Sequence, residues 1–83
     1  MQIEWNREAL EDLEKLDPLI SRRILKRFTW FIQNFDRVIP ELLSGEWKGL
    51  YKFRVGDWRV IYTIRGDIIH ILLVGHRREI YRL

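Results

Sequence analysis

The sequence predicts an α+β fold in which an N-terminal strand and a helical hairpin pack on one face of an antiparallel β-meander. Three observations support this prediction. The chain has 83 residues, which suits a single domain spanning residues 1–83. In the first half, apolar residues recur at steps of three and four, the period of a helix. In the second half they alternate with a period of two around two Gly-Asp pairs, which are typical of tight hairpin turns.

The first half of the chain predicts a short strand followed by two helices. Residues 2–5 alternate in polarity and predict an edge strand. Asn6 is a suitable N-cap for the first helix, and Asp17-Pro18 begins a second helix that extends to about Phe35. Both helices carry an apolar face. Because two helices alone cannot bury both faces, the following sheet is expected to cover them.

The second half predicts a connector and three strands. Residues 36–47 contain Pro, Ser and Gly and form the connector, in which the letters PELL are compatible with a helical turn. The strands are expected at about 50–55, 58–65 and 68–75. The third strand is apolar on both faces, so it is expected in the interior of the sheet with the N-terminal strand on its free side.

The composition excludes several kinds of site. The chain has no cysteine, which removes disulfides, thiolate nucleophiles and Cys-based zinc sites. His70 and His76 have no ligand pattern around them, so no metal and no cofactor is expected. The lack of a signal peptide and of an apolar run long enough for a bilayer favours a cytoplasmic protein without a membrane partner.

The positive charge of the chain lies mainly in its second half. The net charge is +3, and residues 48–83 hold eight Lys or Arg but three Asp or Glu. A solvated basic surface is the simpler interpretation of this asymmetry. It is also typical of proteins that bind nucleic acid.

The first predicted hairpin gathers positive charge on one face of the sheet. A two-residue Gly-Asp turn pairs Arg54 with Arg59, although like charges facing each other on a sheet are destabilising. The face toward the helices is apolar throughout, so Lys52, Arg54 and Arg59 share the opposite face, and no acid on these two strands faces them. Long cationic side chains can simply cap an open sheet face. The functional interpretation is an anion site, most naturally for phosphate.

The register of the third strand stays open. A two-residue turn places His70 and Val74 beside Arg59. A three-residue turn places Gly75 there instead and directs Arg77 toward the basic side chains. A residue as small as Gly75 would allow a ligand to approach closely. His70, within an apolar strand, is expected to be a hydrogen-bonded core residue.

Two stretches, LYKFRVGDWRVIYTI and VGHRREIYR, resemble the RelE/ParE superfamily of toxins from prokaryotic toxin–antitoxin pairs. The resemblance covers essentially the whole chain and looks nearer the RelE branch, which cuts mRNA in the ribosomal A site. It implies a metal-independent, ribosome-dependent endoribonuclease whose partners are a cognate antitoxin, the ribosome and mRNA. The alternative is a non-enzymatic DNA gyrase inhibitor of the ParE type, although that branch generally lacks the basic set.

The resemblance also implies roles for single residues. Lys52 matches a basic residue of the active surface, and it is the candidate general base because repulsion from its neighbours favours loss of its proton. Arg59 and Arg77 match arginines that contact the scissile phosphate and the leaving-group side. Arg54 stands where RelE proteins often carry a second lysine, and arginine stabilises charge but does not act as a base. Tyr81 matches a tyrosine that supports the substrate base.

Further contacts with the RNA backbone are expected from three basic residues, Lys48, Arg78 and Arg82. The chain ends at Leu83, which leaves no room for the C-terminal helix that some members place over the active surface. The site is therefore expected to be open on that side.

Overall fold

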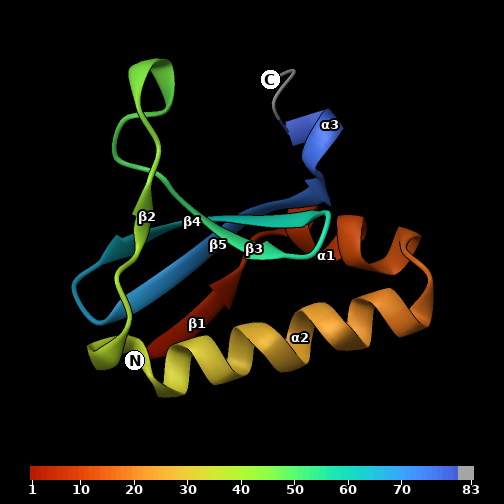
Figure 1. The fold of residues 1–83 in the computed structure, drawn as a ribbon, viewed down its shortest axis with the longest axis horizontal. Coiled ribbons are helices and arrows are strands. Elements are labelled where there is room, and N and C mark those ends of the chain that lie inside the picture. The colour runs from red at the N-terminus through yellow and green to blue at the C-terminus, as the bar shows by residue number, and fades with distance from the viewer. Residues whose placement is uncertain (81–83) are drawn as a thin grey trace.

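The computed structural model describes residues 1–80 and has two layers, a five-stranded sheet and a pair of helices on one of its faces (Figure 1). The predicted α+β class, with a helical hairpin against one face of the sheet, is confirmed. The helices and strands in chain order are β1 (Gln2–Trp5), α1 (Arg7–Lys15), α2 (Pro18–Gln33), β2 (Glu41–Leu42), β3 (Tyr51–Val55), β4 (Trp58–Arg65), β5 (Ile68–His76) and α3 (Arg77–Ile80). Within this described range, no helix is both long and apolar enough to span a membrane.

Side-chain caps begin both long helices where the sequence predicts them. The Asn6 side chain accepts a hydrogen bond from the backbone N–H of Ala9 at 2.8 Å. The Asp17 carboxylate accepts one from the backbone N–H of Leu19 at 2.8 Å. Each bond satisfies an N–H group that the first turn of a helix leaves without a partner. Helix α2 ends at Gln33, two residues before its predicted end.

The sheet has the strand order β1-β5-β4-β3-β2, with β1 parallel to β5 and the other pairs antiparallel. The predicted position of β1 on the free side of β5 is confirmed. The predicted helical turn in PELL is wrong, because Glu41 and Leu42 pair with Lys52 and Tyr51 as the edge strand β2. A strand of two residues is too short to show a period in the sequence. Its position depends instead on the edge of β3, with which it pairs.

A β-bulge settles the register of β5. Both hairpin turns contain two residues, and their glycines, Gly56 and Gly66, have φ of +59°, the left-handed region that favours glycine. Pairing of β4 with β5 continues from the second turn to Tyr62 and then slips by one residue. The slip places Gly75 opposite Arg59. The register of a two-residue turn therefore holds next to the turn, and the alternative register, with Gly75 beside Arg59, holds beyond the bulge.

The core lies between the helices and the sheet. Phe31 of α2 stacks on Phe53 of β3 with ring centroids 4.6 Å apart, and Phe28 meets the edge of Tyr62 at 5.8 Å. Burial raises the pKa of the Tyr62 hydroxyl, so this side chain stays neutral across the physiological range. The buried residues of this cluster are Ala9, Leu13, Ile24, Phe28, Phe31, Val55, Val60, Tyr62, Ile69, Ile71 and Val74.

Two large side chains lie outside the core, and one of them, His70, is a residue that the sequence predicted to be within it. Trp30 is 54% exposed, since it lies two residues, or about 200° around the helix axis, beyond the buried Phe28. His70 alternates with residues that point to the helices, so it lies on the opposite face of the sheet, where it is half-buried. Its Nδ1 is 3.3 Å from a carboxylate oxygen of Glu4.

Asp12 of α1 links the helical layer to the strand beyond the bulge. Its Oδ2 accepts a hydrogen bond from the backbone N–H of Val74 at 3.0 Å. Strand β1 pairs with β5 only as far as Ile71, so the carboxylate supplies an acceptor at the part of the β5 edge that β1 does not cover.

We expect Asp12→Ala to lower the free energy of unfolding by about 1–3 kcal/mol, because the N–H of Val74 loses a charged acceptor in a partly buried place. Chemical denaturation measures this loss. Glu14→Ala is the matched control, because Glu14 is exposed on the same helix and its replacement should change stability by less than about 0.5 kcal/mol. Equal losses in the two variants would show that the hydrogen bond to Val74 does not stabilise the fold.

Candidate functional site

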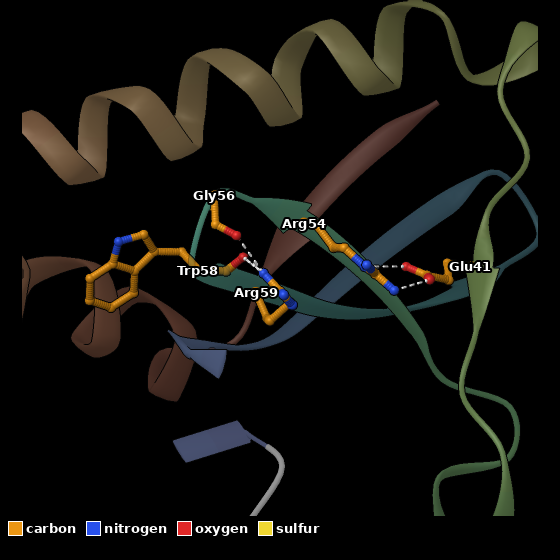
Figure 2. A network of polar contacts seen from close by, with 5 residues as sticks. All are labelled: Glu41, Arg54, Gly56, Trp58 and Arg59. Atoms are coloured by element: carbon orange, nitrogen blue, oxygen red, sulfur yellow. Dashed lines mark hydrogen bonds and ion pairs between the residues drawn. The ribbon is translucent and has the colours of Figure 1, made fainter. Parts of the chain in front are cut away.

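The helix-free side of β3 and β4 carries the predicted basic residues in the predicted register. Arg54 pairs with Arg59, and Lys52 pairs with Ile61. Because directly paired residues of adjacent strands point to the same side of a sheet, Lys52, Arg54 and Arg59 share one surface, termed the basic face. Figure 2 shows Arg54 and Arg59 extending from their strands. This part of the sequence-based prediction is confirmed.

Arg59 is the most deeply buried residue of the basic face, with 6% of its surface exposed. Its Nη1 donates hydrogen bonds to the carbonyl oxygens of Gly56 at 2.8 Å and Trp58 at 2.9 Å (Figure 2). Its Nε is buried and has no hydrogen-bond partner within residues 1–80. The guanidinium is therefore held by its own hairpin, and part of its donor capacity is unused.

Arg54 forms a bidentate ion pair with Glu41 of β2. The distance from Arg54 Nη2 to Glu41 Oε1 is 2.6 Å, and that from Arg54 Nε to Glu41 Oε2 is 3.1 Å (Figure 2). Glu41 also lies in register with Lys52 on the adjacent strand. The two strands of the hairpin supply no acid to this face, as predicted, but the connector supplies one. Sequence reasoning missed Glu41 because no pattern marks β2 as a strand.

Arg77 approaches the same end of the sheet from β5. Its backbone N–H donates to the carbonyl of Asp57 at 2.8 Å, and its Nε is 3.7 Å from Asp57 Oδ1. Asp57 follows Gly56, whose carbonyl binds Arg59. The β3–β4 turn thus brings Arg59 and Arg77 together. The ion pair of Arg77 is half-exposed, and such pairs contribute little to stability.

Helix α3 covers the neighbour of Arg59 on β5. A Cβ atom added to Gly75 would lie 3.2 Å from Cδ1 of Ile80. The single turn of α3 therefore rests against the backbone of β5 at the point where Arg59 pairs with it. A side chain at this position would meet the end of the Ile80 side chain, which would have to shift by a few tenths of an ångström.

A groove of about 260 Å³ runs beside the basic face, between the end of α2 and the edge of the sheet. Its polar end contains Glu41, Lys52 and Arg54, and the rest is apolar. The residues that line it are Trp30, Phe31, Val38, Ile39, Glu41, Lys52, Phe53 and Arg54. Apolar surface beside cationic groups suits a ligand that combines a flat ring with a negative charge.

The other predicted site residues lie apart from this cluster or beyond the described chain. Lys48 is exposed in the loop from β2 to β3, which projects from the sheet edge (Figure 1). Arg78 is exposed on α3, and its backbone N–H donates to Nδ1 of His76 at 3.2 Å. Tyr81 and Arg82 lie outside the described residues.

The described residues bring together guanidinium groups and two carboxylates, Glu41 and Asp57, but no metal-binding cluster. Within residues 1–80, no group of three or more His, Cys, Asp or Glu side chains is placed to hold a metal ion. Guanidinium groups bind phosphate oxygens through paired hydrogen bonds, and a carboxylate can accept a proton. The arrangement can therefore bind a phosphodiester and move a proton beside it.

Comparisons with known proteins agree with this fold. Residues 3–81 match the sequence profile of a family described as the ParE toxin of the type II toxin–antitoxin system parDE. A chain of the RelBE2 toxin–antitoxin complex of Mycobacterium tuberculosis is 29% identical, with a TM-score of 0.79 over 92% of this chain and 90% of that one. No curated protein matches the sequence.

Two further solved structures show the same fold at lower identity. A chain of the RelB–RelE complex of Methanococcus jannaschii is 23% identical, with a TM-score of 0.69 over 95% of each chain. A chain of the intact RelBE complex of E. coli is 18% identical, with a TM-score of 0.73 over 90% of this chain and 94% of that one.

Proposed function

Because the chain belongs to the ParE toxin family of type II toxin–antitoxin systems, within the RelE/ParE superfamily, we propose that it is an endoribonuclease that cuts mRNA in the ribosomal A site. The observation that carries this proposal is the pairing of Arg54 with Arg59 on the sheet face opposite α1 and α2, with Arg77 held at the turn of the same hairpin. The partners are then the ribosome and mRNA in the cytoplasm. The solved relatives are toxin–antitoxin complexes, which supports a cognate antitoxin as a further partner.

The proposed reaction uses the RNA itself as nucleophile, so it needs no metal. The 2′-OH gives its proton to a base and attacks the adjacent phosphate, while the bond from phosphorus to the 5′-oxygen of the next nucleotide breaks. That oxygen leaves and takes up a proton from water, and a 2′,3′-cyclic phosphate remains on the other fragment. Negative charge builds up on the phosphoryl oxygens in the transition state. Arg59 stabilises that charge, because hydrogen bonds to the carbonyls of Gly56 and Trp58 already fix its guanidinium. Arg77 stabilises the leaving-group side from the end of β5.

A general base must remove the proton from the 2′-OH, and we assign this role to Glu41. A carboxylate accepts a proton directly, whereas the Lys52 ammonium must first lose one. Glu41 is held on the basic face by Arg54 and lies in register with Lys52. In this assignment Lys52 and Arg54 neutralise phosphate charge. Lys52 as the base, the role expected from the sequence, is the competing assignment.

The remaining predicted residues would bind substrate or ribosome rather than react. Lys48, Arg78 and Arg82 would contact phosphate groups, so binding should weaken steeply with salt. Tyr81 would stack on a base, a contact worth about 1–3 kcal/mol.

Inhibition of DNA gyrase is the second candidate function, and two observations favour it. The family that matches the chain is described as the ParE toxin, the branch named for this second function. In addition, Arg54 and Arg77 each face a carboxylate of their own chain, Glu41 and Asp57, which reduces the positive charge available to RNA.

The deciding experiment incubates the purified chain with ribosomes that hold a defined mRNA and, separately, with gyrase and relaxed plasmid. We expect cuts within the A-site codon that resist EDTA where the ribosomes tolerate it, and unchanged supercoiling. Arg77→Ala should cut far more slowly, and Arg65→Ala, at the exposed far end of β4, is the matched control. Blocked supercoiling without cuts would select the gyrase function.

A further inference from the structure

The outward side of α2 carries four exposed basic residues that the proposed chemistry does not use. They are Arg22, Arg23, Lys26 and Arg27. The helix contains no Asp or Glu between Pro18 and Gln33. Two like-charged pairs, Arg22 with Lys26 and Arg23 with Arg27, stand four residues apart, a spacing that places them next to each other and destabilises a helix. The fold itself therefore gives no reason for this cluster.

No carboxylate of the described chain neutralises these four residues. Within residues 1–80, none of the ion pairs, which extend to 4.0 Å between charged atoms, includes a side chain of α2. Trp30 lies one turn after Lys26 and is 54% exposed, so an aromatic surface adjoins the charges. Exposed cations with an aromatic neighbour are typical of surfaces that bind nucleic acid.

Arg23 connects this surface with the β3–β4 turn. A Cβ atom added to Gly56 would lie 3.2 Å from Nη2 of Arg23. The same Gly56 accepts a hydrogen bond from Arg59 through its carbonyl oxygen. The turn therefore lies between the cations of α2 and those of the basic face, and positive charge continues around this end of the molecule.

The two cationic surfaces face in opposite directions. Helix α2 lies on one side of the sheet, and α3 lies on the other side, where it covers β5 next to Arg59 (Figure 1). An RNA strand that lies on the basic face therefore leaves the outward side of α2 open to a second RNA element.

We propose that the outward side of α2 binds the phosphate backbone of folded RNA and holds the protein in place while the basic face acts on the cleaved strand. This inference rests on the proposed function, because it takes the second RNA element to be part of the ribosome. The contact does not depend on the RNA sequence, because cations bind the phosphate groups and do not read base edges. These residues position the protein and take no part in the reaction.

The test compares two triple variants that lower the net charge equally. One carries Arg22→Gln, Lys26→Gln and Arg27→Gln. The control carries Arg7→Gln, Lys15→Gln and Arg65→Gln, all of them exposed and away from the outward side of α2. Each protein is titrated with a labelled RNA duplex of about 16 base pairs, without ribosomes, over a range of salt concentrations. Because no cleavage is needed, failure of the nuclease proposal does not alter this result.

We expect the α2 variant to bind the duplex at least about 10-fold more weakly and to lose about two to three units of the slope of log K against log salt. The control should keep nearly the wild-type slope. On programmed ribosomes the α2 variant should show a raised KM and an unchanged kcat. Lys26→Gln alone, which leaves the other cations in place, should lose about one unit of slope.

Two results would overturn the inference. Equal loss of affinity in the two triple variants would show that net charge, not the α2 surface, controls binding. Unchanged duplex binding together with weaker binding of the antitoxin encoded beside this chain would assign the surface to an acidic protein.

Discussion

Replacement of Arg59 by alanine is expected to slow ribosome-dependent cleavage by about 10²–10³-fold, the usual effect of losing one fixed donor to the transition state. Arg59 has the strongest physical case of the basic residues, because hydrogen bonds to the carbonyls of Gly56 and Trp58 hold its guanidinium in one place. Single-turnover cleavage with the toxin in excess over programmed ribosomes measures the effect on the chemical step.

The same replacement removes two hydrogen bonds to the β3–β4 turn, so stability must be measured alongside activity. Thermal unfolding of Arg59→Ala should show a lower midpoint, and the assay temperature should stay well below it. Arg59→Lys keeps the charge but not the planar fork, and we expect it to recover only part of the rate. A folded Arg59→Ala protein that cuts at the wild-type rate would remove Arg59 from the mechanism.

Replacement of Glu41 by glutamine is expected to slow cleavage by about 10²–10⁴-fold, the range typical of losing a general base. The amide keeps the size of the side chain and an acceptor oxygen for Arg54, but it does not take up the proton. Lys52→Met should slow the reaction less, because it removes only charge stabilisation. Both variants are compared with wild type in the same single-turnover assay.

Glu46→Gln is the matched control, because Glu46 is an exposed acid of the same connector. Two outcomes distinguish the competing roles. If Lys52→Met abolishes cleavage while Glu41→Gln accelerates it, Lys52 is the base and Glu41 restrains Arg54. If Glu41→Gln alone loses activity at unchanged affinity for the ribosome, the carboxylate is the base.

Local signals in the sequence correctly predicted much of the scaffold. The caps at Asn6 and Asp17 act between residues two or three positions apart, so they do not depend on the rest of the fold. A two-residue Gly-Asp turn fixes the register of its hairpin, which is why the pairing of Arg54 with Arg59 was predictable. Alternation then determined which side of the hairpin faces the helices.

Other features were outside the reach of such signals. The exposed position of Trp30 has no local signal of its own, because several aromatic residues of α2 compete for the same buried stripe. The bulge in β5 was hidden because the strand is apolar on both faces, so a slip of one residue leaves no mark in its pattern. Beyond the slip, Val74 donates a hydrogen bond to Asp12 of α1, a contact between distant segments that no local pattern marks.

The sequence by itself determined the order of elements, the hairpin register and the charge on one side of the sheet, because each follows from contacts between near neighbours in the chain. Only the tertiary structure decided that Glu41 joins the basic face and that Gly75 lies beside Arg59. These arrangements arise where separate segments meet, and their energies depend on distances that periodicity and turn chemistry do not specify.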